Sequence, residues 1–221
     1  IKKLVTKAKI LNNLAVVLTF FPHPRMVLQK DSKIKLIDTL EDKQRILASL
    51  GIDVLVIHPF SKEFSKLTPI EFTRNILVNT FKVSKIIIGF DHRFGRNREA
   101  SIVDLREFAN VYDFEVEEIP AQEIEKVNVS STKIRTALEQ GDINKVNSYL
   151  NRPYLISGIV CQGEGLGRTI NFPTANIKIK DEYKLCPPNG VYQVKSQIDG
   201  NQVSGMMNIG IRPTVGGNTK T

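Results

Sequence analysis

The chain has 221 residues, of which 41% are hydrophobic and 24% charged, and its formal net charge is +8 with a pI near 9.5. This composition is ordinary for a globular protein, and no apolar run approaches the ~18 residues of a membrane span. The two cysteines, Cys161 and Cys186, exclude a disulfide framework and have no metal-site spacing. With no signal-peptide core behind the basic start, the sequence predicts a reducing, cytoplasmic location.

The positive charge is compatible with nucleic acid, an anionic membrane or small phosphates. The lysines are scattered, the chain has no tryptophan, and no basic patch is interleaved with aromatic residues. A polyphosphate ligand accounts for the charge as well as RNA does. We therefore expect small-molecule partners and neither nucleic acid nor a membrane.

The first half of the chain alternates helix and strand patterns. Strands are predicted over 15–20, 53–57, 85–89 and 114–119, and helices over 1–11, 39–50, 68–81 and 102–112. Thr39 and Asp42 resemble a capping box whose helix stops before Gly51, and the segment 68–71 offers an N-cap, a proline at N1 and a capping glutamate. The alternation predicts a parallel α/β sheet with helices on both faces.

The second half changes from helices to strands. The segment 130–132 is predicted to cap a helix, and a second short helix over 143–150 ends before Arg152-Pro153. Strands are predicted over 154–161, 175–180, 191–198 and 202–208, with Asp199-Gly200 as a hairpin turn. The shift predicts a small all-β domain, a closed barrel, with the domain boundary at 152–153.

Polar residues follow the predicted strands of the first half, where open α/β sheets bind ligands. His23 follows the first strand, and Asp91 follows the strand 85–89. The segment 128–135 brings hydroxyls, a lysine and an arginine to a helix N-terminus, and this combination favours the binding of phosphate. Singly, each has a structural explanation: a rigid turn for His23, an Asx-turn for Asp91, an N-cap for Ser131. Their joint placement favours function.

A glycine-rich stretch follows the first strand of the second half. Gly163, Gly165 and Gly167 free the backbone to form an anion-binding nest, and Arg168 adds donors for phosphate oxygens. Thr174 and Asn176 offer oxygen ligands suited to Mg²⁺. A glycine-rich hairpin is the structural alternative, and it leaves the segment 173–176 unexplained.

Three segments in order resemble riboflavin kinases. The segment 163–176 resembles the family's ATP-phosphate loop and PTAN motif, 188–192 its PxGVY strand, and 208–214 its NIGxRPT segment. The segments 19–24, 89–95 and 130–135 resemble the TFxPHP, GxDxxFG and SSTxIR segments of the bacterial FAD synthetase nucleotidyltransferase module. Essentially the whole chain thus resembles the prokaryotic bifunctional riboflavin kinase/FMN adenylyltransferases.

The resemblance implies a Rossmann-like adenylyltransferase domain over 1–152 and a Greek-key barrel riboflavin kinase domain over 153–221. It implies phosphorylation of riboflavin to FMN and adenylylation of FMN to FAD, with ATP as co-substrate, Mg²⁺ as cofactor and pyrophosphate as product. The residues that it assigns to ATP and FMN in adenylylation are His23, Asp91, Ser131, Thr132 and Arg135. Those that it assigns to the kinase are Gly163, Gly165, Gly167 and Arg168 for ATP phosphates, and Thr174 and Asn176 for the metal.

Some family elements have no counterpart here. The histidines of the GxFDGxHxGH segment, the first strand of the adenylyltransferase domain and the kinase glutamate are expected outside the chain, so no catalytic residue is assigned within it. Two alternatives remain: a riboflavin kinase with a degenerate nucleotidyltransferase domain, and a non-catalytic basic nucleic-acid-binding protein. The sequence leaves open the oligomeric state, the preferred flavin redox state and channelling between the sites.

Overall fold

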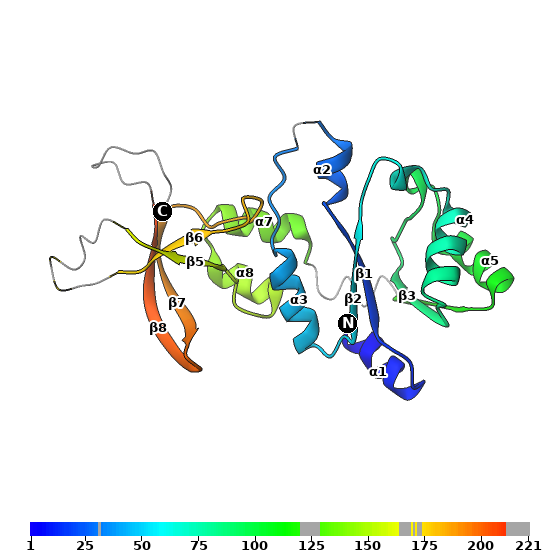
Figure 1. Cartoon of the computed structure of the whole chain (residues 1–221), viewed down its shortest axis with the longest axis horizontal. Helices are drawn as coiled ribbons and strands as arrows, with labels where there is room; N and C mark the ends of the chain where they lie inside the picture. The colour runs from blue at the N-terminus through cyan, green and yellow to red at the C-terminus, as the bar shows by residue number, and fades with distance from the viewer. Residues whose placement is uncertain (31, 120–128, 164–168, 170, 172–173, 211–221) are drawn as a thin grey trace. The chain divides into compact units, whose positions relative to one another are not determined.

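The structure is a computed structural model that describes residues 1–30, 32–119, 129–163, 169, 171 and 174–210 (Figure 1). The chain divides into two compact units. The first contains residues 1–34 and 44–128, and the second contains residues 35–43 and 129–221. No helix in the described part of the chain is long and apolar enough to cross a membrane.

The first unit contains two pairs of parallel strands. Strand β1 (Val16–Phe21) pairs with β2 (Val54–Pro59), and β3 (Lys85–Gly89) pairs with β4 (Glu115–Ile119). The parallel α/β pattern predicted from the sequence is thus present, as two separate two-stranded sheets among the described residues.

Helices and helical turns connect these strands. They are α1 (Lys2–Ile10), α2 (Pro24–Leu28), η1 (Phe64–Lys66), α4 (Pro69–Phe72), η2 (Thr73–Thr80), η3 (Arg96–Arg98) and α5 (Ile102–Tyr112). Helix α3 (Leu40–Ser49) begins in residues of the second unit and ends in the first.

The predicted capping boxes form as expected. In α3 the amide of Asp42 donates to Thr39 Oγ1 (3.0 Å) and the amide of Thr39 donates to Asp42 Oδ2 (3.2 Å). In α4 the same exchange joins Thr68 and Glu71. Each pair satisfies amide groups that have no partner within the helix.

The single helix predicted from 68 to 81 is wrong in its second part. After α4 the backbone widens into the π-helix η2. The amide of Phe81 donates to the carbonyl of Ile76 (3.1 Å), five residues earlier, and Thr80 Oγ1 donates to the carbonyl of Asn75 (2.7 Å). Apolar spacing does not distinguish this wider turn from an α-helix, because both place apolar residues on one side.

The main core of the first unit is apolar. Its buried residues are Phe94, Ala100, Leu105, Ala109 and Phe114. Half-buried side chains of η2, β3 and α5 pack against them. This core supports strand β3 and the loop that follows it, where Asp91 lies.

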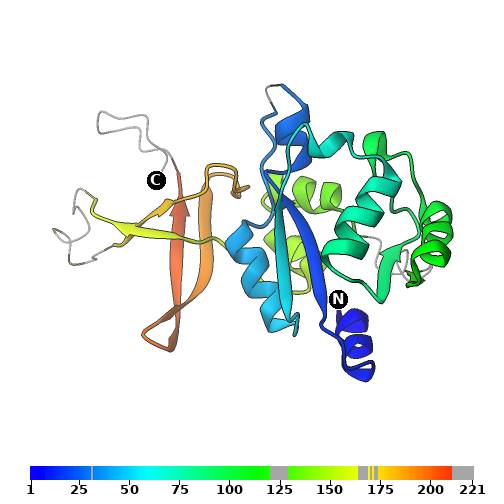
Figure 2. The same cartoon turned by 45° about the vertical axis from the view of Figure 1, so that its right-hand side comes forward.

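The second unit combines two helices with two antiparallel strand pairs. Helices α7 (Ser131–Glu139) and α8 (Ile143–Leu150) pack through Ile134, Ala137, Leu138 and Val146. The strand pairs are β5 (Gly158–Cys161) with β6 (Asn176–Ile179), and β7 (Gly190–Ile198) with β8 (Asn201–Ile209). Figure 2 shows β7 and β8, in orange to red, as one long hairpin.

Two local predictions in this unit have different outcomes. The hairpin turn is confirmed, because Asp199 and Gly200 take φ values of +48° and +81° between β7 and β8. The strand predicted from 154 begins only at Gly158. Before it, the amide of Tyr154 donates to Asn147 Oδ1 of α8 (2.7 Å), a side-chain contact that no strand pattern encodes.

Candidate functional site

His23 is the N-cap of α2, two residues beyond the end of β1. Its Nδ1 accepts a hydrogen bond from the amide of Arg25 (3.2 Å), and Pro24 begins the helix at N1. Because Nδ1 accepts, the proton of the neutral ring lies on Nε2. The half-buried imidazole is therefore held at the carboxyl end of a parallel strand, where the sequence placed a ligand-binding residue.

Asp91 occupies the equivalent place after β3, two residues beyond Gly89. It lies in a tight turn that the amide of His92 closes by donating to the carbonyl of Gly89 (3.1 Å). Asp91 is exposed, and so is Phe90, whose exposed fraction is 43%. The parallel strands thus position His23 and Asp91 alike, and their roles in binding stay a prediction.

His92, beside Asp91, was not among the predicted site residues. Its ring stacks on that of Phe94, with centroids 6.3 Å apart. Partial burial lowers the pKa of His92, the Arg98 guanidinium lowers it further, and the Asp91 carboxylate opposes both. The imidazole is therefore neutral at neutral pH and offers one donor and one acceptor beside the Asp91 carboxylate.

An aromatic cluster connects the ends of β1 and β2 to the loop of Asp91. Its rings belong to Phe20, His58, Phe60, Phe64, Phe72 and Phe94. The closest pair is His58 and Phe64, with centroids 4.3 Å apart. No sequence pattern reveals this cluster, because its members are spread over four elements and two loops and their spacing follows no period.

Ser131, Thr132 and Arg135 lie on the first turns of α7 in the second unit. The N-cap is Ser130, whose Oγ accepts a hydrogen bond from the amide of Lys133 (3.2 Å). The N-cap role considered for Ser131 therefore belongs to Ser130. Ser131 and Thr132 are exposed at N1 and N2. The helix N-terminus thus presents two hydroxyls that the cap does not use.

Arg135 is half-buried, and its Nη1 donates to the backbone carbonyl of Lys35. Lys35 is distant in sequence but belongs to the same compact unit. A guanidinium has five N–H donors, so this contact orients the group and is compatible with anion binding.

In the second predicted site, the structure places Gly163 against Asn176. Gly163 follows β5 by two residues, and Asn176 begins β6 opposite Cys161. An ideal Cβ at Gly163 would lie 1.6 Å from Asn176 Nδ2, so a side chain there must displace the amide. Gly163 is required here by this close approach, and its φ is not positive.

The other predicted kinase residues divide into two groups. Thr174 is exposed, two residues before β6. Gly165, Gly167 and Arg168 lie outside the described residues. Within the described ranges, no group of three or more His, Cys, Asp or Glu side chains could hold a metal ion.

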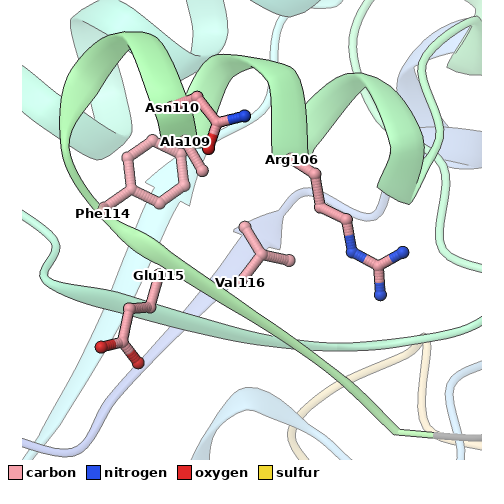
Figure 3. Close-up of a pocket in the computed structure, with 6 residues that line it drawn as sticks. All are labelled: Arg106, Ala109, Asn110, Phe114, Glu115 and Val116. Carbon is pink, nitrogen blue, oxygen red and sulfur yellow. The ribbon is translucent and has the colours of Figure 1, made fainter.

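An open surface depression of about 460 Å³ lies elsewhere on the first unit (Figure 3). Its lining residues are Arg106, Ala109, Asn110, Phe114, Glu115 and Val116, from the end of α5 and the start of β4. It contains none of the predicted site residues and lies at the N-terminal end of β4. Ligands of open α/β sheets bind at the opposite, carboxyl ends of the strands.

Comparison with known families decides what kind of chain this is. The FAD synthetase family model matches residues 1–133, more than half of the chain. The chain belongs to the FAD synthetase family. The riboflavin kinase family model matches residues 150–221 of the same chain.

Named relatives agree with this assignment. The chain is 40% identical over 199 residues to the bifunctional riboflavin kinase/FMN adenylyltransferase of Listeria monocytogenes, covering 90% of this chain and 62% of that protein. Proteins of the same name from Bacillus subtilis and Escherichia coli K12 are 37% and 35% identical, with coverage of 90% and 91% of this chain and 62% and 64% of those proteins. The chain spans less than two thirds of these curated relatives.

A solved structure is also similar to this family member. It is described as the crystal structure of a macrolide-efflux protein from Streptococcus pneumoniae. Its TM-score is 0.83 at 29% sequence identity, with coverage of 100% of this chain and 72% of that chain. The likeness supports the arrangement of helices and strands described above.

Proposed function

We propose that the protein to which this chain belongs forms FAD in two steps, by phosphorylating riboflavin to FMN and then adenylylating FMN. One observation carries the proposal: a single chain matches the FAD synthetase family and then the riboflavin kinase family, in that order. The bifunctional names of its relatives support it.

For the first step, the loop that begins at Gly163 binds ATP phosphates, and the 5′-hydroxyl of riboflavin attacks the γ-phosphorus. The P–O bond to the hydroxyl oxygen forms as the bond to ADP breaks. Such transfer depends on positioning and charge neutralisation. The placement of Gly163 against Asn176 supports a shared site, because the start of the phosphate loop and a predicted metal ligand then meet.

Thr174 and Asn176 fit a magnesium ion by their chemistry, since a hydroxyl and an amide oxygen are hard ligands. When bound, the ion neutralises charge on the ATP phosphates. In this proposal Gly165, Gly167 and Arg168 contribute amide and guanidinium donors to the same phosphates.

For the second step, an oxygen of the FMN phosphate attacks the α-phosphorus of ATP, and pyrophosphate leaves. His23, Asp91, Ser131 and Thr132 bind the two nucleotides, and Arg135 stabilises charge that develops on the phosphates. The positions of His23 and Asp91 at strand ends, and of the hydroxyls at the N-terminus of α7, support these roles.

The same proposal includes the finer architecture. The adenylyltransferase domain is Rossmann-like and extends to 152, and the kinase domain from 153 is a Greek-key barrel. The parallel pairs of the first unit and the antiparallel pairs of the second support this class of fold. The location is cytoplasmic, as for an enzyme with diffusible nucleotide substrates.

The test uses the full-length protein with riboflavin, ATP and Mg²⁺, and follows FMN and FAD by chromatography. Thr174→Val and Asn176→Leu should abolish FMN formation while supplied FMN is still adenylylated. Arg135→Ala should impair FAD formation and leave riboflavin phosphorylation near normal, and Arg135→Lys should recover only part, because lysine lacks the planar fork. If the wild type forms FMN but no FAD, the protein is a riboflavin kinase without adenylyltransferase activity.

A further inference from the structure

Residues 35–42, called the strap here, come from the first half of the sequence but belong to the second compact unit. Their backbone pairs with the segment before β7. The amide of Leu36 donates to the carbonyl of Tyr183 (2.5 Å), and the amide of Leu185 donates to the carbonyl of Leu36 (2.8 Å). The strap is thus held at Leu36 by a segment that follows it by about 150 residues.

A buried ion pair fixes the other end of the strap. Lys184 Nζ donates to Asp42 Oδ2 (2.9 Å) and to the carbonyl of Ile37 (2.7 Å), and the two charged side chains are 1% and 0% exposed. Burial alone raises the pKa of Asp42, but hydrogen bonds from Lys184 and Thr39 outweigh it and hold the pKa below its usual value. The Asp42 carboxylate is therefore charged at neutral pH, and its pairing with Lys184 depends on a single geometry.

Further contacts strengthen the same attachment. The hydroxyl of Tyr154 lies within hydrogen-bond distance of the carbonyls of Leu185 (2.5 Å) and Ile37 (3.0 Å), and its ring lies 4.5 Å from Lys184 Nζ. Arg152 Nη2 donates to both carboxylate oxygens of Asp38 at 2.6 Å. The strap is consequently held by contacts at Leu36, Ile37, Asp38 and Asp42.

The backbone carbonyl at the start of this strap is in contact with Arg135. Lys35 supplies the oxygen that accepts from Arg135 Nη1, and the Lys35 side chain donates to the carbonyl of Glu182. A chain of contacts thus runs from Lys184 through the strap to the guanidinium of α7. An unrestrained arginine loses rotamer entropy on binding, so a fixed acceptor lowers that cost.

We propose that Lys184 and Asp42 are positioning residues for FMN adenylylation: they hold the strap so that the Lys35 carbonyl orients the Arg135 guanidinium toward phosphate. The inference rests on the proposed function of Arg135. Lys184 lies in the segment matched by the riboflavin kinase family, yet its effect falls on the other reaction. Misplacing a binding group by about 1 Å can cost ~100-fold in rate.

The test compares variants of the full-length protein. Asp42→Asn/Lys184→Met removes both charges together, keeps an acceptor for the Thr39 amide and avoids an unpaired buried carboxylate. Lys180→Met, an exposed lysine in the same segment, is the matched control. Arg135→Ala and the combination of all three changes complete the set. The measurements are kcat and KM for both reactions, with thermal unfolding of each variant.

We expect the charge-neutral pair to lower kcat/KM for FMN adenylylation by roughly 10-fold or more, mainly through KM for ATP, with riboflavin phosphorylation within about twofold of wild type. In the Arg135→Ala background the same pair should cause no further loss, because it acts through Arg135. Tyr154→Phe, which keeps the ring but loses the hydroxyl contacts to Leu185 and Ile37, should cause a smaller loss of the same kind.

Other results overturn the inference in distinguishable ways. Equal loss of both activities, or losses that add in the combined variant, would reduce the pair to a structural role. If Asp42→Asn/Lys184→Met adenylylates FMN normally while Arg135→Ala is impaired, the ion pair does not act through Arg135. Normal adenylylation by Arg135→Ala would instead show that the proposed role of Arg135 is wrong, and absence of FAD formation by the wild type would refute the proposed function itself.

Discussion

The two compact units bury different kinds of side chain. Phe94, Leu105 and Phe114 belong to an apolar core in the first unit, whereas the second buries the ion pair of Asp42 and Lys184. Among the described residues, these are the buried side chains that carry charge. Apolar burial is non-directional, but a buried ion pair is stable only in one geometry. The first unit therefore depends on the volume of its apolar side chains, whereas the second, which has an apolar core of its own, depends also on the placement of the strap.

The largest expected effect comes from breaking the ion pair on one side. Lys184→Met should lower the free energy of unfolding by ~3–5 kcal/mol, because Asp42 is left as an unpaired buried carboxylate. Urea unfolding of the full-length protein measures the loss. Asp42→Asn/Lys184→Met should recover most of it; if this pair is as unstable as the single variant, packing and not charge decides stability here.

The apolar core of the first unit should respond to volume. Leu105 is 2% exposed, and Leu105→Ala should cost ~2–5 kcal/mol through a cavity. Leu105→Met should cost less than about 1.5 kcal/mol, since it conserves volume. Val103→Ala, at a position 60% exposed on the same helix, is the control and should change stability by less than about 0.5 kcal/mol. Similar losses for all three would contradict the described packing.

A smaller, local effect is expected at the kinase loop. Gly163→Ala forces the Asn176 amide to move, because the added Cβ would lie 1.6 Å from its Nδ2. Riboflavin phosphorylation should fall by about 10- to 100-fold, with adenylylation of supplied FMN unchanged. Gly205→Ala is the control, since its Cβ would meet Val194 at an ordinary 3.9 Å. Full riboflavin kinase activity in Gly163→Ala would show that Gly163 is not part of the kinase site.

The smallest effect concerns partly exposed ion pairs in the first unit. Hydrogen bonds from Lys7, Lys85 and Lys3 lower the pKa of Glu117 from 4.5 to about 2, against a partial burial that raises it. Because the folded-state pKa is depressed, this carboxylate adds stability that is present above pH 4.5 and lost as the pH falls through about 2.

The wild type should therefore be more stable than Glu117→Gln at pH 6, and the difference should shrink toward pH 2. Unfolding free energies across this range measure it. Glu115→Gln, at a carboxylate whose side chain is 74% exposed, is the control and should change stability by less than about 0.5 kcal/mol. A difference independent of pH would assign the effect of Glu117 to packing.

Much of the local structure could be predicted, because its causes are close in sequence. The Thr39 and Thr68 caps and the Asp199-Gly200 turn depend on partners within four residues. The π-helix η2 could not, since its hydrogen bonds leave the apolar spacing almost unchanged. The start of β5 was missed because Tyr154 bonds to Asn147 and to the strap.

For the candidate sites, the residue types, their order along the chain and the strand ends or helix start on which His23, Asp91 and Ser131 lie could be read from the amino-acid sequence. Short-range backbone preferences carry that information. The contact of Gly163 with Asn176, and the membership of residues 35–42 in a unit formed mainly by residues beyond 128, are known from the folded chain alone. Contacts such as Lys184 with Asp42 leave no periodic trace in the sequence, because the fold alone brings residues so distant in the chain together.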